Sequence, residues 1–191
     1  MNFIREVLLN LAIQKLINPK TDNYLRFKQY ILSNDMPWYY EDSTIPCKTK
    51  QFDPSFFSHI FLKRPGDKED TPEAKRYPTP VSKLLEPFES VIEEIIKVNN
   101  IDIHCIYRMN ANLTQPLRHA KTSPPHVDHR DGFEHKNMLI YLTDAGGDTI
   151  VGKDRHSPKE DDIIVFGGEI HLHNFPLEKR RVVLVMTYAG T

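Results

Sequence analysis

The sequence predicts an α+β fold in which helices of the N-terminal half pack on a C-terminal core of short β-strands. Two observations lead to this prediction. Apolar residues recur at helical spacing in the first hundred residues, whereas from residue 101 onward short apolar runs alternate with turn signals such as Pro124-Pro125 and Gly146-Gly147. Many short strands separated by turns are typical of a sandwich, barrel or jelly roll. We expect one domain over 1–191, helical over about 1–100 and β-rich over about 101–191.

The composition is that of an ordinary globular protein, with 39% hydrophobic residues, 27% charged residues and a net charge of -1. A nearly neutral chain has no global field that attracts nucleic acid or an anionic membrane, so we expect neither as a partner. Cys47 and Cys105 lack the spacing of a zinc site, which indicates reduced thiols. Without a signal-peptide pattern or a long apolar run, the chain is expected to be soluble and cytoplasmic. The sequence carries no signal for an oligomeric state.

Three helices are expected in the N-terminal part. Apolar residues from Ile4 to Leu16 fit one helix face over the first seventeen residues, with a short strand as the alternative. Residues 22–33 are predicted to form a second helix with Asp22 as its N-cap, and residues 81–98 a third, in which Pro87 starts a new helix or bends this one.

Aromatic and branched residues predict a strand over 54–62, and the aromatic segment 38–40 is expected to pack on the core. The charged, proline-containing segment 64–80 is predicted to be an exposed connector, with a lid over a substrate as the alternative. The later apolar runs predict strands within 101–113, 136–143, 148–152, 162–168 and 180–188.

The residues with the strongest chemical signal are His126 and Asp128. Most of the nine histidines fall between His119 and His173, and this pair lies in the segment Pro-Pro-His-Val-Asp. On an extended chain, residues i and i+2 point to the same face, so the imidazole and the carboxylate project together. A third ligand from a distant strand, either His171 or His173, would complete a site with two histidines and one carboxylate, which holds Fe(II) and leaves three positions open.

The order of these features resembles the Fe(II)- and 2-oxoglutarate-dependent oxygenase superfamily on its prolyl-hydroxylase-like side. The resemblance covers about residues 101–189 and rests on HVD at 126–128, LIYLTD at 139–144, GGDT at 146–149, VFGGEIH at 165–171 and a basic residue ten positions later. It implies a double-stranded β-helix, or jelly roll. It also implies metal ligation by His126, Asp128 and His171, although the position of Pro176 keeps His173 as an alternative.

The resemblance also implies a cosubstrate site. Arg181 falls on the basic residue that pairs with the distal carboxylate of 2-oxoglutarate, and a guanidinium suits this role because it binds a carboxylate with two hydrogen bonds and stays charged when buried. Tyr141 matches a tyrosine that assists this contact. Asn112, which shares a strand face with Asn110, is a further cosubstrate-binding candidate. Arg180 is expected to face away from the pocket.

The function implied is that of a 2-oxoglutarate-dependent dioxygenase that hydroxylates a peptide, protein or small-molecule substrate, with a prolyl residue as the first expectation. Its cofactors would be Fe(II), 2-oxoglutarate as cosubstrate and ascorbate as a reductant. One alternative is a nucleic-acid demethylase of the same superfamily, which the near-neutral charge disfavours. The other is a β-helix module that binds a metal or a small ligand without catalysis.

Overall fold

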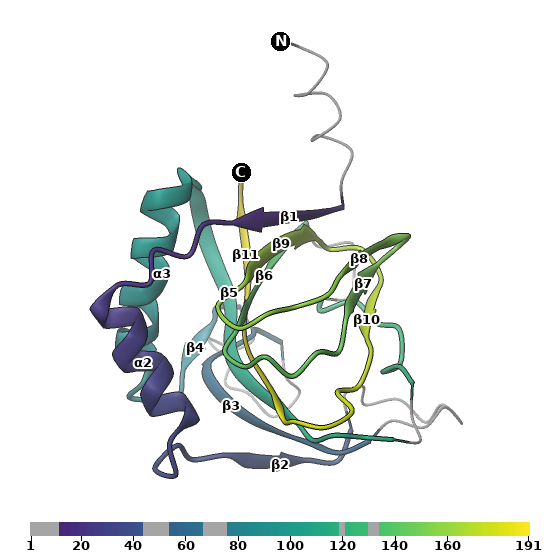
Figure 1. The fold of residues 1–191 in the computed structure, drawn as a ribbon. Coiled ribbons are helices and arrows are strands. Elements are labelled where there is room, and N and C mark those ends of the chain that lie inside the picture. The colour runs from purple at the N-terminus through teal and green to yellow at the C-terminus, as the bar shows by residue number, and fades with distance from the viewer. Residues whose placement is uncertain (1–11, 44–53, 67–75, 119–120, 130–133) are drawn as a thin grey trace.

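The structure, a computed structural model, describes residues 12–43, 54–66, 76–118, 121–129 and 134–191. Within these residues, two antiparallel sheets face each other and two helices cover the outer face of the larger one (Figure 1). Neither helix in the described ranges is long and apolar enough to cross a membrane.

The major sheet contains eight strands from both halves of the chain. Its order is β1-β9-β6-β11-β5-β3-β2, and β4 also pairs with β3. The strands are β1 (Ile13–Leu16), β2 (Tyr39–Glu41), β3 (Phe56–Lys63), β4 (Thr79–Pro80), β5 (Ile103–Thr114), β6 (Lys136–Tyr141), β9 (Ile163–Gly167) and β11 (Arg181–Gly190). The N-terminal part is therefore not purely helical, because four of its segments extend the sheet that the C-terminal strands form.

The minor sheet has the order β10-β7-β8, with strands β7 (Thr149–Val151), β8 (Asp154–His156) and β10 (His171–His173). Two isolated bridges, Thr122 with Asn174 and His126 with His171, place the segment 122–126 along the free edge of β10. The minor sheet therefore gains a fourth, irregular member, and that member carries the His-Val-Asp segment.

Helices α2 (Asp22–Leu32) and α3 (Leu85–Asn99) form where the sequence predicts helices. Tyr24, Phe27 and Ile31 of α2 recur on one helix face and are buried. The N-cap is Thr21, whose hydroxyl accepts a hydrogen bond from the Tyr24 amide. The prediction of Asp22 as N-cap was wrong by one position: Asp22 lies in the first turn, where its charge favours the helix dipole.

Helix α3 is continuous through Pro87, which lies in its first turn and not at a break. A proline is tolerated there because the first amides of a helix have no intrahelical acceptor. The buried residues of α3 are Leu85, Phe88, Val91, Ile92 and Ile95. The helix ends at Asn100, which adopts the left-handed conformation that asparagine tolerates.

The strands at the centre of the major sheet are buried on both faces. In β11, Val182, Leu184 and Met186 belong to the core between the sheet and the helices, whereas Val183 and Val185 belong to a second core between the two sheets. This alternation follows from the two-residue period of a strand. It also directs Arg181 and every second residue after it toward the space between the sheets.

Where the structure can test the two interpretations of the first seventeen residues, the helix is wrong and the alternative, a short strand, is confirmed. Residues 13–16 form β1, which pairs antiparallel with β9 from Ile13 opposite Phe166 to Leu16 opposite Ile163. The free edge of β9 offers unpaired backbone groups, and this distant pairing overrides a local apolar pattern that suits a helix. Residues 1–11 of the predicted helix lie outside the described residues.

The aromatic segment 38–40 packs on the core only through Trp38. Tyr39 and Tyr40 lie in the edge strand β2 and are 61% and 62% exposed, so this part of the prediction was wrong. The predicted strand over 54–62 is confirmed as β3. Of the predicted connector 64–80, residues 67–75 lie outside the described part.

An ion-pair cluster joins α2 to the turn before β9. Asp161 accepts hydrogen bonds from Lys28 and from the Tyr24 hydroxyl, the latter at 2.6 Å, and lies 3.1 Å from the Lys20 ammonium. Burial by itself would raise the pKa of Asp161, but the hydrogen bonds from Lys28 and Tyr24 outweigh burial and lower it. Asp161 also has a φ of 69°, a conformation that aspartate and asparagine tolerate better than most residues.

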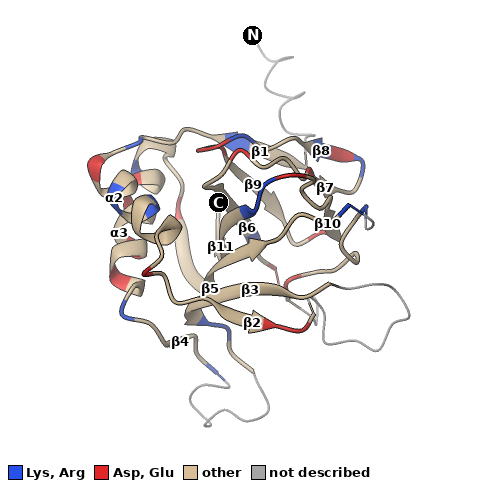
Figure 2. Ribbon diagram, turned by 60° about the horizontal axis from the view of Figure 1, so that its bottom comes forward, with Lys and Arg blue, Asp and Glu red and all other residues tan. Residues whose placement is uncertain are grey.

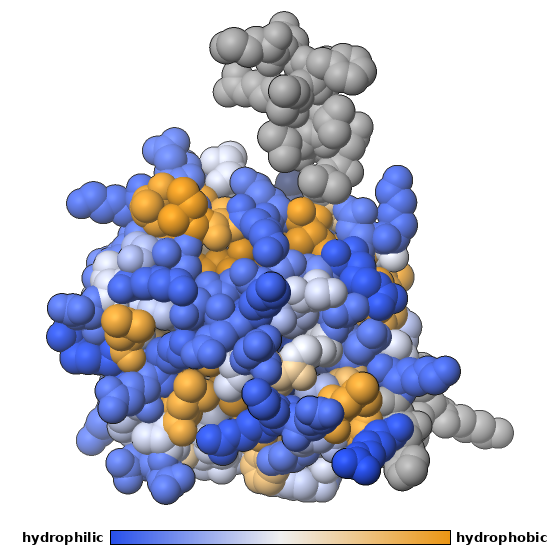
Figure 3. All heavy atoms as spheres, in the orientation of Figure 1, coloured by the Kyte–Doolittle hydropathy of each residue, from blue (hydrophilic) through white to orange (hydrophobic). Residues whose placement is uncertain are grey.

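Within the described residues, charged residues of both signs are distributed along the helices and connecting segments, and the central strands are mostly uncharged (Figure 2). On the face seen in Figure 3, apolar side chains stand among hydrophilic ones. Exposed apolar residues such as Ile17 and Leu25 are ordinary for a folded protein.

Candidate active site

A cavity of about 890 Å³ lies between the two sheets. Its walls are the inward-facing residues of strands β3, β5 and β11, the facing residues of the minor sheet and the His-Val-Asp segment. Leu139, Val183 and Val185 form part of an apolar wall. The polar lining includes His126, Asp128 and His171, and Arg181 lines the same cavity.

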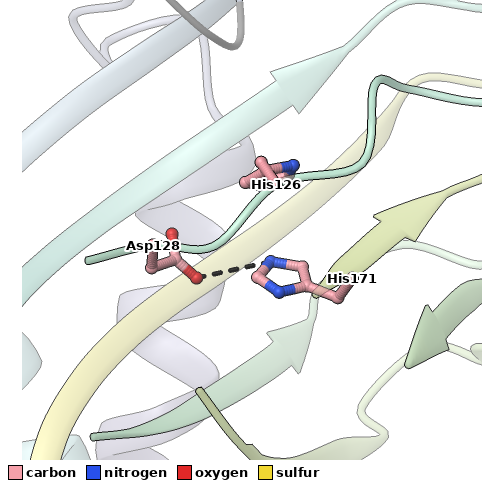
Figure 4. A group of neighbouring side chains, drawn as sticks. All are labelled: His126, Asp128 and His171. Atoms are coloured by element: carbon pink, nitrogen blue, oxygen red, sulfur yellow. Dashed lines mark ion pairs between the residues drawn. The ribbon is translucent and has the colours of Figure 1, made fainter. Parts of the chain in front are cut away.

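His126 and Asp128 come from one segment and His171 from strand β10, and the three side chains point toward one another (Figure 4). One possible ligand atom from each residue lies within 4.8 Å of those of the other two. The bridge between His126 and His171 brings the imidazole rings to a centroid distance of 4.5 Å, and the Asp128 Oδ2 lies 3.3 Å from the His171 Nε2. The three side chains that the resemblance implies as metal ligands therefore lie close together.

Backbone contacts set the orientation of both imidazole rings. The His126 Nδ1 lies 3.0 Å from the Pro124 carbonyl oxygen, and the His171 Nδ1 lies 3.1 Å from that of Glu169. A carbonyl oxygen only accepts, so each Nδ1 carries a proton, and in a neutral imidazole this tautomer leaves the lone pair of Nε2 available to a metal. Such a contact is the usual support of a metal-binding histidine.

The charge states also suit a cation. Burial lowers the pKa of His171 despite the opposing charge of Asp128, so the ring is neutral at neutral pH. Burial would raise the pKa of Asp128, but the surrounding basic side chains, His171 first and then Arg108, His126 and Arg64, together outweigh burial and keep the pKa below its usual value. Two imidazoles and one carboxylate that face the same cavity fit Fe(II), since this donor set leaves positions open for other ligands.

Arg181 is 5% exposed and lines the same cavity as the three candidate metal ligands. Its Nη2 donates to the Thr149 Oγ1 at 3.3 Å, and its guanidinium carbon lies 5.2 Å from the centre of the Tyr141 ring. The Tyr141 hydroxyl lies 2.7 Å from the same Thr149 oxygen. Among the described residues no carboxylate pairs with Arg181. Arg180 is exposed, in agreement with the predicted orientation.

Asn112 lines the cavity on β5 and accepts a hydrogen bond from the Asn110 amide at 2.6 Å, so the two share a strand face as predicted. Tyr141 is almost fully buried and reaches the site through the Thr149 hydroxyl. His173 also lines the cavity, but it lies opposite Thr149 on β7, whereas His171 lies opposite Val151 and beside His126. The geometry therefore groups His171, and not His173, with the other two candidate ligands.

Three residues at the site were not anticipated. Thr149 belongs to the Gly-Gly-Asp-Thr motif but was not singled out, although it contacts both Tyr141 and Arg181. Arg108 and Arg64 contact Asp128 and line the cavity. Strand periodicity places Arg108 on the same face of β5 as Asn112, which is a signal that could have identified it. Arg64 lies just beyond β3, and no local pattern indicates its contact.

The fold and the site together define a class: the chain has the double-stranded β-helix fold of the 2OG-Fe(II) oxygenases, and its cavity carries the candidate His-Asp-His triad. An oxidoreductase of the 2OG-Fe(II) oxygenase family from Burkholderia pseudomallei is similar over 96% of this chain and 88% of its own, with 15% identity and a TM-score of 0.64. No protein-family model and no curated protein matches the sequence.

Two further solved structures show the same likeness. A prolyl hydroxylase from Trichoplax adhaerens, in complex with a peptide fragment of the oxygen degradation domain of hypoxia inducible factor, matches 98% of this chain and 87% of its own at 11% identity and a TM-score of 0.58. The collagen prolyl hydroxylase of Paramecium Bursaria Chlorella virus-1 matches 97% and 99% at 12% identity and a TM-score of 0.54. At identities this low, structural similarity establishes the fold alone. It confirms the predicted double-stranded β-helix.

Proposed function

We propose that the protein is an Fe(II)- and 2-oxoglutarate-dependent dioxygenase that hydroxylates its substrate. His126, Asp128 and His171 would hold the iron, and Arg181 would bind the distal carboxylate of 2-oxoglutarate together with Thr149 and Tyr141. The observation that carries this proposal is a buried guanidinium without a carboxylate partner among the described residues, in the same cavity as a two-histidine, one-carboxylate cluster. A buried charge of this kind is costly unless a ligand pairs with it.

Each residue has a defined task in this proposal. Asp128 offsets part of the charge of the ion, and the two imidazoles bind it in their neutral form. Arg181 orients the cosubstrate, assisted by Asn112 on the neighbouring strand. The apolar wall of Leu139, Val183 and Val185 limits access of water. When bound, iron and 2-oxoglutarate supply the oxidising power: oxygen is consumed, 2-oxoglutarate becomes succinate and carbon dioxide, and a substrate C–H bond becomes C–OH.

The first substrate that we propose is a prolyl residue in a peptide or protein. This follows from the resemblance of the sequence motifs, and two of the structures with the same fold are prolyl hydroxylases by name. A similar fold does not identify what the pocket binds, so the substrate needs a direct test. Turnover with a free amino acid but not with proline-containing peptides would move the assignment to small molecules.

The experiment measures succinate formed from 2-oxoglutarate in the presence of Fe(II), oxygen and ascorbate, with and without a library of proline-containing peptides. We expect succinate formation in the wild type and none above background in the Asp128→Asn variant, which keeps the size of the side chain. If the protein binds Fe(II) and 2-oxoglutarate but forms no succinate with any of the substrates, it is a non-catalytic binding module. Stimulation by methylated single-stranded DNA alone would identify a demethylase.

A further inference from the structure

The aspartate of the candidate triad does not lie in a strand. His126 pairs with His171 through a bridge, but Asp128 follows in a bend, where strand periodicity no longer fixes the direction of a side chain. A carboxylate has two equivalent oxygens and can bind a cation through one or both. The open positions of a facial site depend on which of these modes the carboxylate adopts, because a second bound oxygen would occupy one of them.

Contacts from the major sheet restrict this bend. The Arg108 Nη1 lies 3.3 Å from the Asp128 Oδ1, whereas the Oδ2 is the oxygen that faces the His171 Nε2 at the same distance. Arg108 is opposite Thr187 in the pairing of β5 with β11, and the Thr187 hydroxyl lies 2.8 Å from the Nε2 of His129, the next residue of the bend. Two neighbouring strands therefore hold two consecutive residues of the bend.

Arg64 adds a third contact, since its guanidinium donates a hydrogen bond to the backbone oxygen of Asp128. The Arg108 side chain is 16% exposed and the Asp128 side chain 9% exposed, so their contact is shielded from water and stronger than a surface ion pair. The two oxygens of Asp128 are thus distinguished: one faces an arginine and the other faces the candidate metal ligands.

We propose that Arg108 is a positioning residue that holds Asp128 as a ligand through Oδ2 alone and so keeps three coordination positions open. This inference rests on the proposed iron site. Arg108 does not touch the ion in this arrangement, and it acts through the orientation of Asp128.

The direction in which metal affinity changes when Arg108 is replaced distinguishes a positioning role from electrostatic repulsion. A guanidinium beside a cation site repels the cation, so loss of the charge alone would tighten metal binding. Loss of a contact that orients a ligand would weaken it, by roughly 10- to 100-fold for groups that support metal ligands. Replacement of Arg108 therefore has opposite expected results under the two explanations.

The experiment uses the full-length protein and Co(II) as an air-stable probe for Fe(II), titrated by calorimetry and visible absorption. We expect Arg108→Met to weaken Co(II) binding roughly 10- to 100-fold, and Arg108→Lys to weaken it less because lysine keeps one charged donor. Under anaerobic conditions with saturating Fe(II) and 2-oxoglutarate, Arg108→Met should also reduce the visible charge-transfer band of the chelated cosubstrate. Arg155→Met, which removes an exposed arginine paired with Asp148, is the matched control.

A double-mutant cycle excludes a merely structural role. In an Asp128→Asn background, Arg108→Met should cause no further loss of Co(II) affinity, because the carboxylate that it positions is already gone. Equal or tighter binding by Arg108→Met in the wild-type background would overturn the inference, and so would the same loss in both backgrounds. If Arg108→Met does not fold, as seen from its circular dichroism, Arg108→Lys decides by the same criteria. Failure of the wild type to bind Co(II) would refute the proposed iron site itself.

Discussion

Replacement of Arg181 by methionine should have opposite effects on ligand binding and on stability. Arg181 is 5% exposed, and its contacts include the Thr149 hydroxyl at 3.3 Å and the Tyr141 side chain, whose ring centre lies 5.2 Å from the guanidinium carbon and with which it also shares a hydrogen bond. These contacts contribute about 1 to 3 kcal/mol, whereas burial of an ion costs several kcal/mol. Burial also lowers the pKa of Arg181, because removal from water disfavours the charged form of the guanidinium. Without a ligand, the buried charge therefore destabilises the folded state.

Methionine has a similar length and no charge, so the ligand-free Arg181→Met variant should be as stable as the wild type or more stable by about 1 to 4 kcal/mol. Binding of 2-oxoglutarate should change in the other direction. A buried carboxylate that loses its partner costs about 3 to 5 kcal/mol, which corresponds to a dissociation constant raised by roughly two to three and a half orders of magnitude.

The assay combines urea unfolding of the metal-free proteins with calorimetric titration of 2-oxoglutarate into the Co(II)-loaded proteins. Arg180→Met is the control, because Arg180 is the adjacent residue and is exposed. It should change neither quantity appreciably. The reasoning is refuted if Arg181→Met binds 2-oxoglutarate nearly as well as the wild type, or if its ligand-free form is clearly less stable.

Three further predictions concern metal binding, pH and backbone strain. His171→Ala should abolish Co(II) binding and His173→Ala should leave it close to wild type, as judged by titration; the reverse result would exchange their roles. Asp161→Asn should lose about 1 to 3 kcal/mol of stability near pH 7. Because folding lowers the pKa of Asp161, the difference in unfolding free energy between the two proteins should be complete above about pH 5, shrink as pH falls through the pKa of the folded state and vanish below it. Urea titrations at several pH values measure this difference. A difference that does not change with pH would contradict the prediction. Gly147→Ala should destabilise the fold by about 1 to 3 kcal/mol, because φ is +84° and a Cβ would lie 2.6 Å from a backbone oxygen; an unchanged thermal midpoint would contradict this.

Local patterns in the sequence were sufficient to predict elements with a clear helical or strand periodicity. The helical pattern of residues 22–33 predicts α2, although the structure buries Tyr24 and Phe27 with Ile31, whereas Leu25 and Tyr30 of the expected face are exposed. The apolar run from Val182 to Tyr188 predicts β11. Such patterns gave a strand at β1 only as the alternative to a helix, because Ile13–Leu16 is stabilised by pairing with β9, which is distant in sequence. They also gave no sign that β8 exists as a separate strand between β7 and β9.

By itself, the sequence determined which residue types could form the site. The motif order placed His126, Asp128 and Arg181 in their candidate roles, and strand periodicity explains why Arg181 faces inward while Arg180 does not. The tertiary structure alone decided that His171 and not His173 stands beside His126, because strand register is set by pairing between distant segments. Strand periodicity can place Arg108 on the cavity face of β5, but only the tertiary structure revealed its contact with Asp128, because Asp128 lies in a bend of a segment that is distant in sequence.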